Sequence, residues 1–260
     1  MQVSHRRQES RHLGRTMEYR VYGHTGWPVV VFPTSQGRFF QYEDSGMVKA
    51  LERFIESGQI QLWTVDGIDS ETFFADHGDL GARIGRHEAY FRHVREEILP
   101  EVAQTSRAAN GGREMKPLVT GCSMGGFHSA NFLFRFPDAV AGVIALSGVY
   151  STRHFFGPAL DGQIYFNSPL DYLPGLADEA LLGRLRQCHL VFCCGQGAWE
   201  DDMLEDTRRL EGILRDKGIP AWVDYWGGDV NHDWPWWHKQ MPYFLDKWLD
   251  AAHRPVAAAS

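Results

Sequence analysis

The feature that most constrains the fold is a repeated alternation of continuous apolar runs with segments of helical periodicity. Two of these runs, P-V-V-V-F-P at 28–33 and V-A-G-V-I-A-L-S at 140–147, are rich in β-branched side chains and contain no regular polar alternation. Such runs are typical of strands buried on both faces, as in parallel sheets covered by helices. The sequence therefore predicts an α/β fold with a mostly parallel central sheet flanked by helices.

The expected elements follow one another from about residue 16 to residue 250. Strands are predicted at 16–22, 28–33, 59–66, 117–122, 140–147, 189–194 and 221–226. Helices are predicted at 43–57, 83–105, 125–136, 202–216 and 232–250. Pro100 is expected to split the second of these helices into two.

Two segments fall outside this alternation. Basic residues gather between His5 and Arg15, where acidic and polar residues interrupt them, and we expect a solvated edge strand or arm. Residues 148–187 are rich in Gly, Pro, Asp and aromatic side chains and are too long for an ordinary connection. We predict a single domain over 1–260, with 148–187 as a cap or loop insertion near a functional site.

Net charge, apolar runs and cysteine spacing indicate the cellular compartment and the kinds of partner. The net charge of -7 argues against nucleic acid as a partner. No apolar run approaches the ~20 residues of a membrane span, and the N-terminus lacks the apolar core of a signal peptide. The four cysteines form no C-x-x-C pair, which favours reduced thiols and no zinc site. These features predict a cytoplasmic protein without membrane contact; a homo-oligomer is an open alternative to a monomer.

The stretch G-C-S-M-G at 121–125 fits G-x-S-x-G between a predicted strand and a predicted helix. A sharp strand-to-helix turn there would expose the hydroxyl of Ser123 in a strained conformation. Side chains at 121 and 125 would collide across so tight a turn, which explains both glycines. The amide of Met124 would point at an oxyanion formed on a substrate. Packing of small residues alone is the alternative explanation, but the flanking strand and helix favour a nucleophile.

A serine hydroxyl needs a base to take its proton, and in folds of this order that base is a histidine near the C-terminus. Three histidines follow the last predicted strand, at positions 232, 238 and 253. His232 lies directly beyond that strand in G-G-D-V-N-H-D-W and is the expected base. His238 lies further along the helix and suits the surface or a supporting position, and His253 lies in the expected frayed tail.

The acid that orients the histidine should follow strand 189–194. The stretch G-A-W-E-D-D offers Glu200, Asp201 and Asp202. Glu200, at the loop–helix boundary, is the leading candidate, Asp202 the first alternative and Asp201 the second. Either aspartate could instead cap helix 202–216.

The loop after strand 28–33, T-S-Q-G-R-F-F-Q-Y, should supply a second oxyanion donor. The main-chain amide of Ser35 or of Gln36 could serve, and Gly37 would let the loop approach closely. Any polar strand–helix connection looks similar, so the loop sequence favours neither amide.

Other side chains could line a site formed by the loops. His154, Asp66 and Asp69 are candidate substrate contacts, although a turn-forming role suits Asp66 equally well. A metal site built from His232, Asp233 and His238 is disfavoured, because the serine pattern already accounts for His232. Aromatic side chains in the expected loops favour an apolar acyl pocket over a charged one. They are Phe39, Phe40, Tyr42, Phe155, Phe156, Tyr165, Phe166, Trp199, Trp234, Trp236 and Trp237.

Three stretches carry a resemblance to a known family: G-C-S-M-G-G at 121–126, G-Q-G-A-W-E at 195–200 and W-G-G-D-V-N-H-D-W-P-W-W at 226–237. The chain resembles the esterase branch of the α/β-hydrolase superfamily, which includes S-formylglutathione hydrolase and mycolyltransferase-like esterases. The resemblance implies carboxylic-ester hydrolysis through an acyl-enzyme, without a metal or cofactor. It places the acid three residues past a Q-G pair, at Glu200, where Asp is usual, and it matches the oxyanion amide best to Ser35.

The sequence thus predicts a serine hydrolase acting on small or medium acyl esters, with a small-molecule ester as its partner. Two alternatives remain open. One is an acyltransferase that uses the same three side chains and passes the acyl group to an alcohol or sugar. The other is a catalytically silent α/β-hydrolase that serves as a binding module.

Overall fold

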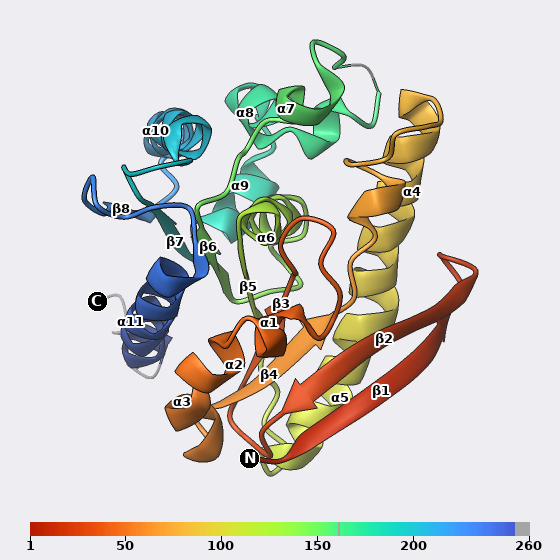
Figure 1. Cartoon of the computed structure of the whole chain (residues 1–260), viewed down its shortest axis with the longest axis vertical. Coiled ribbons are helices and arrows are strands. Elements are labelled where there is room, and N and C mark those ends of the chain that lie inside the picture. The colour runs from red at the N-terminus through yellow and green to blue at the C-terminus, as the bar shows by residue number, and fades with distance from the viewer. Residues whose placement is uncertain (161, 253–260) are drawn as a thin grey trace.

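In the computed structural model, which describes residues 1–160 and 162–252, one eight-stranded sheet runs through the molecule in the order β1-β2-β4-β3-β5-β6-β7-β8 (Figure 1). The six strands from β4 to β8 in this order pair in parallel, whereas β1–β2 and β2–β4 pair antiparallel. The strands are β1 (Val3–Ser10), β2 (Arg15–Tyr22), β3 (Trp27–Val31), β4 (Ile60–Val65), β5 (Leu118–Cys122), β6 (Gly142–Leu146), β7 (His189–Cys194) and β8 (Trp222–Tyr225). The predicted α/β fold with a mostly parallel sheet is confirmed.

Helices cover both faces of this sheet. The α-helices are α1 (Gln41–Asp44), α2 (Met47–Ala50), α3 (Glu52–Glu56), α4 (Leu80–His93), α5 (Leu99–Ala109), α6 (Met124–Arg135), α7 (Arg153–Phe156), α8 (Pro169–Tyr172), α9 (Glu179–Leu185), α10 (Asp201–Asp216) and α11 (Trp234–Ala252). Three 3₁₀ turns, η1 (Asp69–Glu71), η3 (Tyr165–Asn167) and η4 (Leu173–Gly175), and one π-helical segment, η2 (Val94–Ile98), complete the described elements.

Alternate side chains of the strands enter two separate cores. Val30 and Phe32 pack with α4, α5, α6, α9 and α10 on one face, whereas Val29 and Val31 pack with α1–α3 and α11 on the other. This two-sided burial explains the continuous apolar runs, because successive side chains of a strand point to opposite faces. The sheet thereby holds the ends of its parallel strands at fixed positions, from which the site loops start.

The N-terminal basic segment forms an edge strand. Among the described residues, β1 pairs along one side only, with β2, and the side chains of β1 that precede Ser10 are exposed or half-buried. The sequence expectation of a solvated edge strand therefore agrees with the structure.

Two predicted helices differ from the structure. The single helix expected at 43–57 is three short helices, broken at Gly46, which has a left-handed φ of 88°. The helix expected at 83–105 runs from α4 through η2 into α5, and Pro100 lies in the first turn of α5 rather than between two helices. The π-helical segment ends at Ile98, two residues before Pro100, and accommodates the residue that lacks an amide hydrogen, so the helix continues.

The segment 148–187 contains short elements, α7, η3, α8, η4 and α9, among its described residues. Figure 1 shows α7 and α8 beyond the end of the sheet at which α6 begins. Leu182 and Leu185 of α9 pack into the same core as α6. The role of residues 148–187 as a cap, and the single-domain organisation over 1–260, stay predictions.

Candidate active site

Ser123 lies at the turn between β5 and α6, and its backbone is strained. Its φ of 55° and ψ of -123° are values that a non-glycine residue rarely adopts. Strain of this kind costs about 1–3 kcal/mol and persists only where the surroundings fix it. Here the Ser123 amide donates to Leu146 O at 2.8 Å, and Phe127 donates to Ser123 O at 3.1 Å. The turn thus has the geometry expected from G-x-S-x-G.

The two glycines of the motif have different neighbours. A Cβ on Gly121 would overlap the backbone of Gly125, as the sequence suggested. A Cβ on Gly125 would instead overlap the carbonyl oxygens of Phe32 and Pro33, which follow β3. The expected mutual collision therefore explains Gly121 only, and Gly125 is required by the close approach of α6 to the end of β3.

His232 lies in the loop between β8 and α11, more than a hundred residues after Ser123. Its Nε2 lies 2.9 Å from Ser123 Oγ. Its ring stands edge-on to Trp237 with 4.9 Å between ring centroids, and its amide donates to Ala198 O at 3.0 Å. The side chain of Asn231 accepts from the Ala198 amide at 2.8 Å. The loop that carries His232 is thus fixed to the loop that precedes α10.

Glu200 occupies the N-cap position of α10 and is only 1% exposed. Its Oε2 lies 3.4 Å from His232 Nδ1, and its Oε1 accepts a hydrogen bond from Ser147 Oγ at 2.6 Å. Asp201 and Asp202 lie in the first turn of α10, and both are exposed. The structure therefore brings Glu200, and neither aspartate, to the imidazole.

The contacts of the two ring nitrogens of His232 fit one tautomer of the imidazole. With a proton on Nδ1, His232 donates to the Glu200 carboxylate, and its Nε2 then accepts from the Ser123 hydroxyl. In that tautomer the imidazole can remove the serine proton, and the buried carboxylate stabilises the imidazolium that forms. The arrangement can therefore generate a serine nucleophile.

The two candidate oxyanion donors of the loop after β3 differ in what they bond. Thr34–Gly37 form a turn closed by Gly37 N and Thr34 O at 2.9 Å, with Gln36 at a φ of 56°. The main-chain amide of Gln36 donates to Asp69 Oδ2 at 3.3 Å. The Ser35 amide has no acceptor among residues 1–160 and 162–252. Met124 is the first residue of α6, so its amide has no acceptor within the helix.

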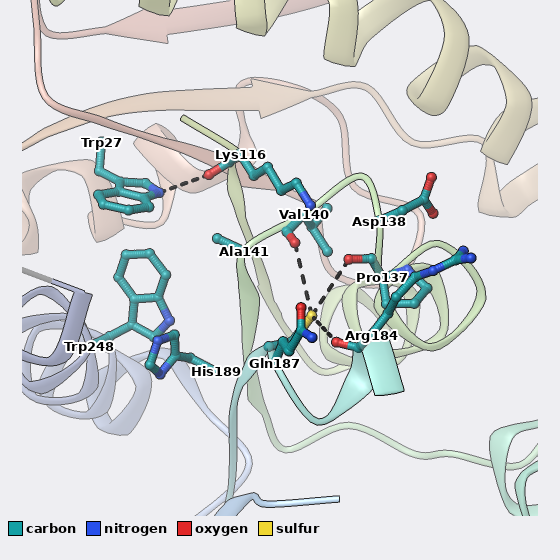
Figure 2. Close-up of a pocket in the computed structure, with 11 residues that line it drawn as sticks. Trp27, Lys116, Pro137, Asp138, Val140, Ala141, Arg184, Gln187, His189 and Trp248 are labelled. Atoms are coloured by element: carbon teal, nitrogen blue, oxygen red, sulfur yellow. Dashed lines mark hydrogen bonds between the residues drawn. The ribbon is translucent and has the colours of Figure 1, made fainter. Parts of the chain in front are cut away.

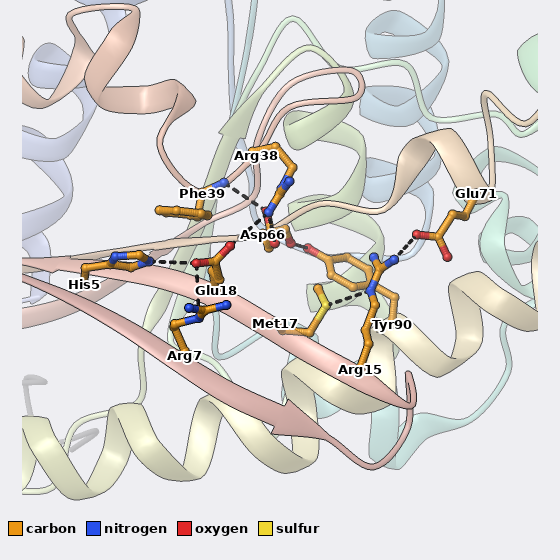
Figure 3. Close-up of polar contacts among 10 residues, drawn as sticks. All are labelled: His5, Arg7, Arg15, Met17, Glu18, Arg38, Phe39, Asp66, Glu71 and Tyr90. Carbon is orange, nitrogen blue, oxygen red and sulfur yellow. Dashed lines mark hydrogen bonds and ion pairs between the residues drawn. The ribbon is translucent and has the colours of Figure 1, made fainter.

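Asp66 and Asp69, considered as substrate contacts, face the protein instead. Asp66 receives the Arg38 guanidinium at 2.5 and 3.0 Å and the Phe39 amide at 3.3 Å, as Figure 3 shows. Asp69 is bound to Gln36 and to His128 Nε2, which lies 2.8 Å from its Oδ1. Both carboxylates therefore act on the conformation of the loop after β3.

Neither His154 nor His238 forms a hydrogen bond with Ser123 in the described part of the chain. His154 lies 3.1 Å from Asp206. His238 has a buried Nε2 without a partner in the described part of the chain and packs against Trp234. His253 lies outside the described residues. No group of three or more His, Cys, Asp or Glu side chains suited to a metal ion occurs within residues 1–160 and 162–252, and the set His232, Asp233 and His238 is not such a group.

An apolar cluster surrounds Met124. Phe155 and Phe156, expected from the sequence, join it, and Phe156 stacks on Phe73 at 5.3 Å between centroids. Phe73 and Phe127 were missed: Phe73 lies in a stretch without an obvious site motif, and Phe127, two residues after G-x-S-x-G, was expected only as part of helix 125–136. Trp199, next to Glu200, is 83% exposed at a φ of 66°. The cluster places apolar surface beside the amide that would bind an oxyanion.

A pocket of about 500 Å³ lies elsewhere (Figure 2). Trp27, Lys116 and His189 line it, at or before the amino ends of β3, β5 and β7. Ser123 follows the carboxyl end of β5. The pocket is therefore at the opposite end of the sheet from the candidate active site.

The mostly parallel sheet with helices on both faces is the α/β-hydrolase fold. Residues 10–247 match the protein family described as "Putative esterase", and the chain belongs to that family. The expected resemblance and the prediction of a carboxylic-ester hydrolase are thus confirmed at the level of the family. No curated protein matches the sequence significantly.

Solved structures show the same fold at low sequence identity. A ferulic acid esterase is 20% identical, with 94% of this chain and 96% of that chain covered and a TM-score of 0.71. An S-formylglutathione hydrolase from Agrobacterium tumefaciens is 13% identical, with 95% and 94% covered and a TM-score of 0.69. The fluorophosphonate-binding serine hydrolase FphF of Staphylococcus aureus is 14% identical, with 95% and 98% covered and a TM-score of 0.66.

Proposed function

We propose that this esterase cleaves carboxylic esters through Ser123 as nucleophile, His232 as general base and Glu200 as the carboxylate that orients the imidazole. The observation that carries the proposal is the 2.9 Å separation of Ser123 Oγ and His232 Nε2. The strained backbone of Ser123 and the burial of the Glu200 carboxylate support it. Both features cost free energy of folding, and such costs are typical of functional sites.

In the proposed reaction, His232 takes the proton of Ser123 as Oγ attacks the ester carbonyl. The tetrahedral intermediate collapses when His232 returns the proton to the leaving alcohol, which leaves an acyl-serine. Water, activated by the same imidazole, then attacks the acyl-serine and releases the carboxylic acid. The Glu200 carboxylate stabilises the imidazolium.

The amides of Met124 and Ser35 are the proposed oxyanion donors. Met124 is supported by its position at the first turn of α6, where the helix N-terminus also favours negative charge. Ser35 is supported over Gln36 because Asp69 already accepts from the Gln36 amide. Removal of one such donor typically lowers kcat by about 10²–10³-fold.

The substrate is proposed to carry a small or medium acyl group of apolar or aromatic character. Phe73, Phe155 and Phe156 form an apolar wall beside Met124. An apolar pocket with a few polar groups is the usual form of a small-molecule site. The name of the ferulic acid esterase among the similar structures agrees with an aromatic acyl group, and it belongs to that protein only.

Hydrolysis of p-nitrophenyl esters of increasing acyl length tests the proposal. The wild-type protein should release p-nitrophenol, and Ser123→Ala and His232→Ala should each lose several orders of magnitude in kcat. Full activity of the Ser123→Ala protein would contradict it. An inactive wild-type protein would instead favour a silent binding module.

Product analysis separates a hydrolase from an acyltransferase. The acyl-serine is common to both, so the test is the fate of the acyl group when an alcohol or a sugar is present with water. We expect the free acid as the main product, and an ester of the added alcohol as the main product would identify a transferase.

The proposal includes a cytoplasmic location. Cys122, Cys188, Cys193 and Cys194 are all free thiols, which suits a reducing compartment. Among the described residues, no helix is long and apolar enough to cross a membrane.

A further inference from the structure

Asp69 joins two elements that the proposed reaction uses. It follows β4 in η1, is 4% exposed, and accepts from His128 Nε2 at 2.8 Å and from the Gln36 amide at 3.3 Å. His128 lies on α6, five residues after Ser123 and four after Met124. Gln36 directly follows Ser35. One buried carboxylate thus connects the helix that carries one proposed oxyanion donor to the turn that carries the other.

We propose that the Asp69–His128 pair is a positioning element that sets the distance between the amides of Ser35 and Met124. This inference rests on the proposed function of Ser123. Asp69 touches no reacting atom in this account. It acts through Gln36, whose amide it holds, and the neighbouring Ser35 amide is thereby left free for the substrate.

The turn needs an acceptor outside itself. Its own closing bond uses Gly37 N and Thr34 O, so the Gln36 amide has no partner within the turn. Gln36 also has a left-handed φ of 56°, which a non-glycine residue keeps only when its surroundings enforce it. A Cβ on Gly67 would overlap Gly37 O, so the segment after β4 packs directly against the turn. The Asp69 carboxylate supplies the missing acceptor from that segment.

Burying the Asp69–His128 pair costs free energy that apolar side chains in the same place would not cost. His128 is 2% exposed, and its ring lies among Phe32, Phe73 and His87, with centroids 5.3–6.1 Å away. Its Nδ1 has no partner in the part of the chain that the structure describes. Apolar side chains of similar volume would fill this space at least as well, since burying ionisable groups is costly. The directed bond to the turn is the feature that apolar side chains could not supply.

A second carboxylate, Asp66, binds the part of the same loop that follows Gly37. Asp66 accepts from the Phe39 amide and pairs with Arg38, as drawn in Figure 3. Asp69 is the carboxylate that bonds next to Ser35. We therefore expect Asp69 to control oxyanion binding more directly than Asp66.

The test compares Asp69→Ala, Asp69→Asn and a control, Glu97→Ala. Glu97 is a matched buried carboxylate: it pairs with His93 at 2.5 Å and accepts the Arg11 amide at 3.0 Å, but at the β1–β2 turn. The probes are a p-nitrophenyl ester and a trifluoromethyl ketone. Ser123 Oγ adds to the carbonyl carbon of the ketone, and the resulting hemiketal places a negatively charged oxygen in the proposed oxyanion site.

Asp69→Ala should lower kcat/KM about 10- to 100-fold and weaken ketone binding by a similar factor, with KM changed less than about threefold. Asp69→Asn keeps an acceptor for the Gln36 amide and should recover activity to within about fivefold of wild type. Glu97→Ala should stay within about threefold of wild type.

Equal kcat/KM and ketone affinity in Asp69→Ala and Glu97→Ala would overturn the inference, as would a loss confined to KM. If Asp69→Ala does not fold, His128→Phe keeps the ring and removes the donor to Asp69. That variant should lose at least about fivefold in kcat/KM, and unchanged kinetics would equally overturn the inference. Activity that survives in Ser123→Ala would refute the proposed function instead.

Discussion

Ser147 donates a 2.6 Å hydrogen bond to Glu200, and this bond links the ends of two neighbouring strands. Ser147 directly follows β6, and Glu200 follows β7 by six residues. Trp237 Nε1 donates in turn to Ser147 Oγ at 3.1 Å, and the same indole packs against the ring of His232. The carboxylate is therefore oriented by a chain of side chains that also contacts the imidazole.

Replacing Ser147 by alanine should lower kcat/KM about tenfold. The variant removes a hydrogen bond to a buried charged group, and such bonds typically contribute about 1.5–3 kcal/mol. Steady-state ester hydrolysis measures the effect. Ser106→Ala, which removes another buried serine hydroxyl on α5, is the control and should keep wild-type activity. Equal activity of the two variants would show that Ser147 does not support Glu200.

The identity of the acid is tested by Glu200→Gln against Asp202→Asn. Glu200 is buried beside His232, whereas Asp202 is exposed in the first turn of α10. Glu200→Gln should lower kcat by about 10³–10⁴-fold, as expected for a triad acid. Asp202→Asn should change kcat less than about threefold. The reverse order would transfer the role to Asp202.

The close packing at Ser123 predicts that Gly121→Ala is destabilising. The added Cβ would overlap the backbone of Gly125, so the strand-to-helix turn must shift, at a cost of about 1–3 kcal/mol or more. Chemical denaturation measures the free energy of unfolding. Gly183→Ala in α9 is the control: no atom lies within 4 Å of its added Cβ, and alanine should stabilise that helix by about 0.5–1 kcal/mol. A Gly121→Ala protein as stable as wild type would contradict the structure of the turn.

His154 should contribute stability that depends on pH. The hydrogen bond to Asp206 raises the pKa of His154, against the lowering effect of its partial burial. Because the folded-state pKa is raised, the stabilisation is complete below the ordinary histidine pKa of about 6.5 and is lost as pH rises through the folded-state value.

Thermal unfolding of wild type and His154→Asn at pH 5.5 and pH 9 tests this. The difference in melting temperature between the two proteins should be larger at pH 5.5. A difference that is the same at both pH values would contradict a protonated His154 bound to Asp206.

The sequence alone predicted the mostly parallel sheet, and it indicated Ser123, His232 and Glu200, which the structure brings within hydrogen-bonding distance of one another and whose catalytic roles are proposed above. Continuous β-branched runs such as 28–33 marked the buried strands, and the G-x-S-x-G turn and the order of the later elements indicated Ser123 and His232. Among the three candidate acids, Glu200 was preferred by its position at the loop–helix boundary. Its burial and the exposure of Asp202 became visible only in the structure.

The supporting residues could not be predicted, because their contacts join segments far apart in the chain. Asp69 reaches Gln36 and His128 across 33 and 59 residues, and Ser147 reaches Glu200 across 53. Asp69 appeared as a candidate substrate contact because it follows a strand, which was the only local signal. The break at Gly46 was missed because Met47 and Leu51 keep helical spacing and are buried as expected.

The most direct test of the central claim is covalent labelling with an alkyl fluorophosphonate, followed by peptide mapping. The account predicts one adduct, on Ser123, that is absent in Ser123→Ala and forms far more slowly in His232→Ala. An unlabelled wild-type protein, or an adduct on another residue that persists in Ser123→Ala, would contradict it.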